Sequence, residues 1–197
     1  MKKKPTNTSE WDTVIESEHS FFDVNFKELW HYRDLLVLFV KRDFVTVYKQ
    51  TILGPLWFFI QPLLTTITFT VIFGNVAQLS TDGAPKIIFY MAGITLWNYF
   101  SNCLTSVSGV FNANAGIFGK VYFPRLIMPL TIVVSNLMKF GVQFLLFICF
   151  IIYFTLNHQI SPNSWVLFTP FIILLMAVIS MGIGLILSSM TTKYKDL

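Results

Sequence analysis

The residues best suited to contact a partner lie in a short polar segment, Asn112–Pro129 (NANAGIFGKVYFPRLIMP). Lys120 and Arg125 are the only charged residues between Lys86 and Lys139, and long apolar runs flank the segment on both sides. Two cations and two prolines between such runs predict a tight loop at a membrane face. We expect this loop to be the working part of the chain, through which an energy source in the cytoplasm moves the membrane helices.

The chain contains no recognisable catalytic machinery. It has no Walker A loop, no HExxH sequence and no nucleophile elbow. Its three histidines are scattered, and Cys103 and Cys149 both lie in apolar runs without a nearby histidine, which predicts neither a metal site nor a disulfide framework. We therefore expect no catalytic residue, metal or cofactor in this chain, and its work must be driven from outside.

Several polar residues interrupt the apolar runs. Asn98, Asn102 and Ser106 line up along the second run, and amides in a membrane span need partners or water, so they either line a polar path or bond neighbouring helices. Lys139 lies well inside the third run, where a cation is costly and functional by default. It either contacts an anionic substrate in a cavity or is a structural lysine whose stem reaches toward the membrane surface.

Small residues at four-residue spacing predict close contact between membrane helices. One stripe contains Ser101, Thr105, Gly109 and Ala113, and a second contains Ser180, Gly184 and Ser188. We expect both to pack within one helical bundle rather than at a subunit interface.

Composition places these residues in a membrane protein. The chain is 54% hydrophobic and 12% charged, whereas a soluble domain is about 45–50% apolar and about 25% charged. About 20 uncharged residues cross a bilayer as a helix. The runs predict four spans within a transmembrane domain at 55–197, at about 56–76, 87–110, 130–156 and 165–190, with a cytoplasmic loop at about 111–129. The expected fold is an all-α membrane protein.

The N-terminal part divides in two. Residues 1–25 are polar and predict a flexible cytoplasmic tail. Residues 26–54 predict a basic amphipathic helix, which beside a span lies in the headgroup plane. Its apolar residues fall on one side: Leu29, Tyr32, Leu36, Phe39, Val40, Phe44 and Val47. Gly54-Pro55 ends this helix and starts the first span.

The distribution of basic residues sets the expected orientation. Cytoplasmic segments are enriched in lysine and arginine, which predicts a cytoplasmic N-terminus for this multi-pass membrane protein. Lys86 is then the only lysine or arginine in the predicted outer loops. Acids interspersed among the N-terminal basic residues argue against nucleic acid as a partner and leave membrane lipids as the expected one. The inner segments contain Lys2, Lys3, Lys4, Lys27, Arg33, Lys41, Arg42, Lys49, Lys120, Arg125, Lys193 and Lys195.

Three stretches resemble one protein family. Tyr32–Leu63 (YRDLLVLFVKRDFVTVYKQTILGPLWFFIQPL) resembles the start of the permease subunits of type-2 ABC exporters for cell-surface polysaccharides, such as O-antigen, capsule and teichoic acid. Gly119–Leu130 (GKVYFPRLIMPL) resembles the first cytoplasmic loop of that family and the entry to its third span. The final TKYKDL resembles its second cytoplasmic loop, and the resemblance extends from about Phe26 to Leu197.

The resemblance implies a division of labour. It places the protein in the bacterial cytoplasmic (inner) membrane, where two permease copies form a pore as a homodimer and separate ATPase subunits bind ATP and magnesium beneath it. A short coupling helix in the loop fits a cleft of the ATPase, and a lipid-linked glycan passes outward. The residues matched to the ATPase-coupling loop are Asn112, Asn114, Phe118, Lys120, Tyr122 and Arg125.

The family usually has six spans, and this sequence contains four, so the resemblance implies that the last two are missing here. The alternatives are a type-2 ABC permease for a drug, lipid or other small substrate, and a four-span membrane assembly protein without transport activity. A membrane enzyme is disfavoured for want of an acid–base or metal set.

Overall fold

The computed structural model describes residues 26–49, 56–158, 160 and 163–193. The predicted tail at 1–25, the Gly54-Pro55 break and residues 194–197 lie outside the described residues. Every regular element among those described is helical: α1 (Phe26–His31), α2 (Arg33–Lys49), α3 (Trp57–Phe69), the π-helix η2 (Thr70–Val76), α4 (Lys86–Ser108), α5 (Val110–Ala113), α6 (Ala115–Phe118), α7 (Ile127–Leu156), the 3-10 helix η3 (Ser164–Phe168) and α8 (Thr169–Lys193).

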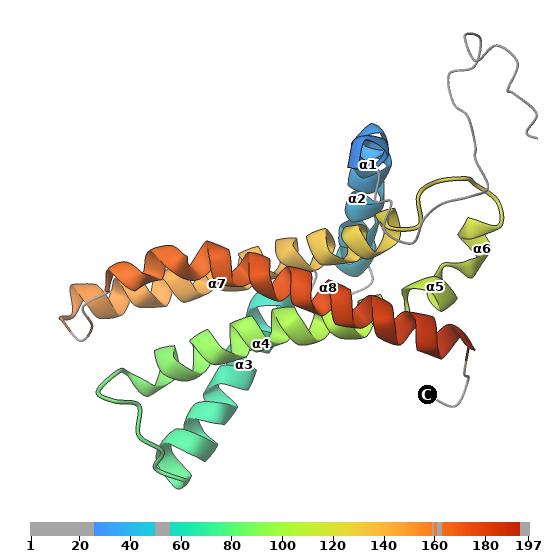
Figure 1. Cartoon of the computed structure of the whole chain (residues 1–197). Helices are drawn as coiled ribbons and strands as arrows, with labels where there is room; N and C mark the ends of the chain where they lie inside the picture. Colours follow the sequence, from blue (N-terminus) through green and yellow to red (C-terminus); the bar gives the residue numbers. More distant parts are fainter. Residues whose placement is uncertain (1–25, 50–55, 159, 161–162, 194–197) are drawn as a thin grey trace, which may run out of the picture.

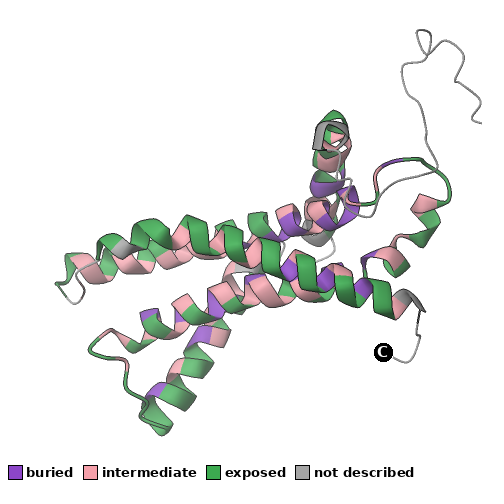
Figure 2. Ribbon diagram, viewed as in Figure 1, coloured by how far each residue is buried: buried purple, intermediate pink, exposed green. Residues whose placement is uncertain are grey.

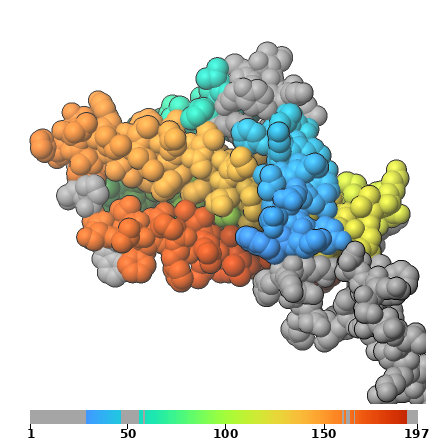
Figure 3. All heavy atoms as spheres, turned by 90° about the horizontal axis from the view of Figure 1, so that it is seen from above, coloured from blue at the N-terminus to red at the C-terminus, as the bar shows by residue number. Residues whose placement is uncertain are grey.

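The bundle is organised around α4, which contacts α3, α7 and α8. In Figure 1, α4 runs along both α7 and α8, and α2 crosses the start of α7 at a steep angle. The view from above shows α7 and α8 next to each other, with α2 lying across the start of α7 (Figure 3). The sequence predicted one amphipathic helix at 26–54. The described part of that segment, residues 26–49, forms two helices, because the regular helix is interrupted at Tyr32.

Three of the four predicted spans are long and apolar enough to cross a membrane by length and composition: Phe59–Val76, Ile127–Leu156 and Val166–Thr191. The predicted second span, at 87–110, corresponds to α4, which is long enough but not among these three. Its hydropathy is lowered by polar residues, of which Thr95 is buried and Asn98 half-buried. Because its neighbours cover α4, protein packing rather than lipid surrounds much of it.

The bundle has two chemically different ends. The basic end contains α2, α5, α6 and the start of α7, with Lys41, Arg42, Lys120 and Arg125. The opposite end contains the connection at 77–85 and the end of α7 (Figure 1). Buried residues gather near the basic end, whereas the outer halves of α7 and α8 are largely exposed (Figure 2).

At the opposite end, Lys86 fastens the start of α4 to the end of η2. Its Nζ donates to the carbonyl oxygen of Gly74 at 2.7 Å and to Asn75 Oδ1 at 3.2 Å. The last carbonyls of a helix lack partners within it, so a lysine there satisfies them. Gly74 permits the close approach, since a Cβ at this position would lie 3.0 Å from Lys86 Cδ.

The two small-residue stripes have different surroundings. Ser180, Gly184 and Ser188 of α8 are all buried, and a Cβ on Gly184 would lie 2.8 Å from the side chain of Val107. The packing expected of Gly109 within one bundle is not found, because this residue is exposed and a Cβ there meets nothing within 4 Å. About 100° of helical turn per residue places Gly109 on the side of α4 away from Val107, so α8 does not cover it.

Alanine substitutions at the two glycines test this difference. We expect Gly184→Ala to destabilise the protein by about 1–3 kcal/mol, because the added methyl group overpacks the contact with Val107. Gly109→Ala is the matched control and should leave stability nearly unchanged. Thermal unfolding in detergent measures both, and equal midpoints for the two variants would show that α8 does not approach α4 this closely.

Cysteine labelling tests the predicted orientation of the two ends. We expect Gly119→Cys at the basic end to escape a membrane-impermeant maleimide in intact cells, and Asp82→Cys at the opposite end to react. Both positions are exposed, so the difference reports sidedness rather than burial. Both variants also carry Cys149→Ser, because Cys149 is exposed. Rapid labelling of Gly119→Cys without labelling of Asp82→Cys would show that the orientation is opposite to the predicted one.

Candidate functional site

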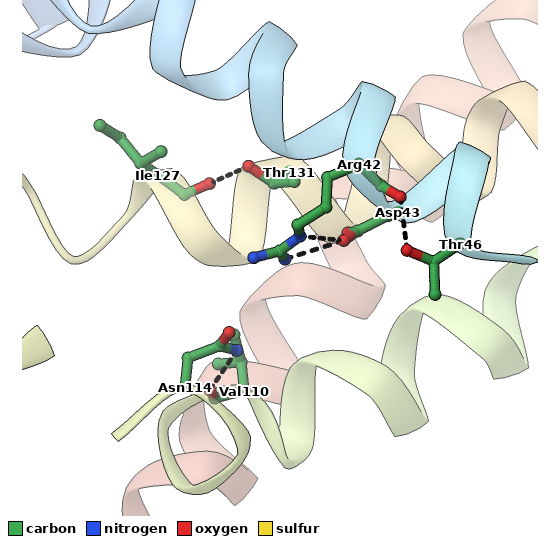
Figure 4. A network of polar contacts seen from close by, with 7 residues as sticks. All are labelled: Arg42, Asp43, Thr46, Val110, Asn114, Ile127 and Thr131. Carbon is green, nitrogen blue, oxygen red and sulfur yellow. Dashed lines mark hydrogen bonds and ion pairs between the residues drawn. The ribbon is translucent and has the colours of Figure 1, made fainter. Parts of the chain in front are cut away.

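The loop predicted at about 111–129 is partly helical. We define the coupling segment as residues 110–126, which comprise α5, α6 and the stretch before α7. The turn between the two short helices is closed by Asn114, whose Nδ2 donates to the carbonyl oxygen of Val110 at 2.9 Å (Figure 4). Asn114 is half-buried and therefore shapes the segment from within.

A row of aromatic rings holds the coupling segment in place. Phe118 lies 5.9 Å from Phe111 and 5.4 Å from Phe123, measured between ring centroids, and the second pair is stacked. Phe123 also lies 6.0 Å from Phe39 of α2. Such aromatic pairs contribute roughly 0.5–1.5 kcal/mol each beyond their buried area. The segment is therefore attached to α2 as well as to the spans on either side of it.

These rings belong to a larger apolar cluster that the sequence did not indicate. Its buried members, which we call the basic-end cluster, are Phe39, Val110, Phe123, Ile127 and Met128. The amphipathic helix was expected to lie in the headgroup plane; in the structure Phe39 and Val40 are buried within the protein. Among the side chains of α1 and α2 whose burial is described, Trp30, Val37 and Leu38 are the large apolar ones that stay exposed.

The residues predicted for ATPase coupling fall into two groups. Asn112, Lys120, Tyr122 and Arg125 are exposed at the basic end, where a partner protein can reach them. Asn114 and Phe118 are half-buried and support the segment's conformation. Phe123, which is 5% exposed, was missed because it lies in a non-helical stretch where no periodicity marks the buried side.

A cavity of about 350 Å³ opens beside the cluster, between α2, α4 and α7. We call it the basic cavity. It brings together two residues of the predicted polar path, Ser106 and Lys139, with two charged residues of α2 that were not predicted to join them. The lining residues are Arg42, Asp43, Thr46, Ser106, Ile132, Ser135, Asn136 and Lys139.

Arg42 is held by three contacts at the cavity edge. Its Nη2 and Nε lie 2.8 Å and 3.0 Å from Asp43 Oδ1, and its carbonyl oxygen accepts a 2.8 Å hydrogen bond from Thr46 (Figure 4). Its Cζ lies 4.9 Å from the ring centroid of Phe39, within the range of a cation–π interaction. Arg42 therefore contacts both the basic cavity and the basic-end cluster.

The remaining polar residues of α4 do not all meet. Asn102 and Ser106 are exposed and Asn98 is half-buried, and only Ser106 lines the basic cavity. Asn98 lies at a separate groove of about 760 Å³ between α3 and α4, which also exposes Phe69, Phe73, Phe89 and Trp97. Exposed amides are unfavourable against acyl chains, so this face of α4 requires water or a further protein surface.

The arrangement offers binding surfaces rather than a reaction centre. Among the described residues, no group of three or more histidines, cysteines or carboxylates is placed to hold a metal ion. What the site provides is an exposed basic segment at one end of the bundle, joined through packed rings to a cavity with two cations.

Comparisons with known proteins assign the class of this helical membrane protein. Residues 34–197 match the family described as "ABC-2 type transporter", and the chain belongs to this family. It is therefore a multi-pass integral membrane protein of the type found in the inner membrane of bacteria, as predicted.

The chain is also similar to curated proteins with a more specific name. An "O-antigen export system permease protein RfbA" of Klebsiella pneumoniae is 32% identical over 165 residues, which is 83% of this chain and 61% of that protein. A protein of the same name in Myxococcus xanthus is 25% identical over 171 residues, covering 87% of this chain and 64% of that protein. The chain thus spans about three fifths of the length of these relatives, and the predicted resemblance to polysaccharide-export permeases is confirmed.

Alanine substitution tests whether Phe123 anchors the coupling segment. We expect Phe123→Ala to destabilise the protein by about 3–5 kcal/mol, since a buried ring is lost. Tyr122→Ala is the matched control, because Tyr122 is the adjacent residue in the chain and its side chain is 60% exposed. Thermal unfolding in detergent compares the two, and a similar midpoint for both variants would mean that the basic-end cluster does not support the fold.

Proposed function

We propose that this chain is the membrane subunit of an ATP-driven exporter of lipid-linked cell-surface polysaccharide. The observation that carries the proposal is the exposed, basic coupling segment in a chain of the ABC-2 family whose relatives are named O-antigen export permeases. The chain itself carries no nucleotide-binding motif, so ATP and magnesium belong to a separate ABC ATPase subunit.

The coupling segment is the part that meets the ATPase. Lys120, Tyr122 and Arg125 project from it, and the ring contacts of Phe118 and Phe123 connect it to α2 and α7. A push on the exposed residues is transmitted to α2 and to the membrane helix α7 together, because the residues of the basic-end cluster are buried against one another and do not yield locally. This is the mechanical requirement for coupling nucleotide hydrolysis to movement of the spans.

A second copy of the subunit completes the path. The open face of α4 carries Asn98, Asn102 and Thr105, and Gly109 follows directly after the helix on the same side. Together they combine hydrogen-bonding groups with the small side chains that permit close helix contact. Facing this surface toward a second copy hides its amides from lipid. The adjoining groove presents aromatic rings, with Trp97 64% exposed, and such rings suit the apolar faces of sugars.

Charge reversal in the coupling segment tests the proposal. We expect the double variant Lys120→Glu, Arg125→Glu to lose co-purification of the ABC ATPase from nanodiscs, while the spans stay folded because both side chains are exposed. Glycan export in cells should be lost with it. Tagged full-length protein, expressed with the ATPase, provides the measurement.

The matched control is Lys120→Arg, Arg125→Lys, which keeps the charges and should retain the ATPase. Undiminished recruitment by the charge-reversed protein would exclude these residues as the docking site. If the wild-type protein never recruits an ATPase, the exporter proposal itself fails and a structural membrane role gains support.

A further inference from the structure

The basic cavity contains an unmatched positive charge. Arg42 is paired with Asp43 at 2.8 Å. Lys139 forms no ion pair among the described residues, and its Nζ donates only to the neutral amide of Asn136, at 3.3 Å. A cation within a membrane-spanning helix is costly unless another charge compensates it. An anion in the cavity would supply that compensation.

The other lining groups suit a phosphate. The cavity provides an arginine fork, a lysine ammonium and the hydroxyls of Ser106 and Ser135, which match the several acceptor oxygens of a phosphate. Ser135 is 5% exposed, and its Oγ is buried without a hydrogen-bond partner within the described part of the chain. A buried hydroxyl without a protein partner, in the wall of a cavity that two cations also line, can donate to an oxygen of a bound phosphate.

We propose that the basic cavity binds a phosphate monoester or diphosphate carried by a membrane lipid, and that Asp43 regulates its occupancy. The lipid is inferred as the source because the cavity lies among membrane helices; its identity as the exporter's cargo rests on the proposed function. The phosphate takes the ammonium of Lys139 and competes with Asp43 for the guanidinium of Arg42.

Occupancy of the cavity reaches the coupling segment through Arg42. Its guanidinium lies over Phe39, Phe39 contacts Phe123, and Phe123 stacks on Phe118. A phosphate that draws Arg42 away from Asp43 changes the cation–π contact with Phe39. The row of rings then carries the presence of a lipid phosphate to the surface that meets the ATPase.

The test uses the full-length permease alone in phosphatidylcholine nanodiscs, with and without phosphatidic acid as the phosphate-bearing lipid. Native mass spectrometry measures retained phosphatidic acid, and a fluorophore on Gly119→Cys, in a Cys149→Ser background, reports the coupling segment. We expect retention and a fluorescence change, both weakened at least tenfold in Arg42→Gln and Lys139→Gln. Asp43→Asn should respond at several-fold lower phosphatidic acid content, because the competing carboxylate is gone.

Two further variants make the result specific. Lys41→Gln removes an exposed charge of α2 that does not line the cavity, and it should behave as wild type. Phe39→Leu should retain phosphatidic acid but lose the fluorescence change. Equal weakening by Lys41→Gln and Arg42→Gln would indicate diffuse attraction to anionic lipid and overturn the site, and weaker binding by Asp43→Asn would overturn its regulatory role.

Inorganic pyrophosphate, added to nanodiscs without phosphatidic acid, separates the two sources of phosphate. A fluorescence change with phosphatidic acid but not with pyrophosphate supports a lipid as the source of the phosphate. A fluorescence change with pyrophosphate alone overturns the lipid as the source. No ATPase is present in these measurements. Failure to recruit an ATPase therefore counts against the proposed function only, and failure to retain phosphatidic acid counts against the cavity only.

Discussion

Lipid supplies no hydrogen-bond partners, and α4 is the helix on which this constraint falls most heavily. Its polar side chains would be unfavourable if lipid surrounded the whole helix. Contacts with α3, α7 and α8 replace much of that lipid with protein. One side remains open, with Asn102 and Ser106 exposed. The position of α4 at the centre of the bundle follows from this requirement, and its open side needs water or a further protein surface for the same reason.

The second organising feature is the basic-end cluster, where a helix crossing the bundle and a segment between two spans share one apolar core. Neither α5 nor α6 is long enough to be stable alone, since isolated helices shorter than about 12–15 residues are marginal in water. Packing against Phe39 and Phe123 supplies the missing stability. The same contacts make α2 and the coupling segment respond together, and through Arg42 they reach the basic cavity.

Much of this architecture was predictable because membranes impose length and charge rules on a sequence. The apolar runs indicated the helices near 56–76, 130–156 and 165–190. The short polar segment at 112–129 indicated the connection between the second and third predicted spans. The partner of Phe39 was not predictable, because an amphipathic pattern identifies an apolar side without saying whether lipid or protein covers it. Phe123 was missed because it lies in a non-helical stretch that has no periodicity, and the exposure of Gly109 depended on which side of α4 is approached by α8.

The attachment of Lys86 to the carbonyl oxygen of Gly74 has a consequence for how the bundle can deform. This contact joins α4 to η2, which continues α3, at the end of the bundle opposite the basic end. Gly74 allows the two segments to lie close together there. Two helices joined at one end can separate only by a hinge motion about that end. Separation of α3 from α4 is then smallest at the contact between Lys86 and Gly74 and largest toward the basic end, so any opening between these two helices begins at the basic end and reaches the opposite end last.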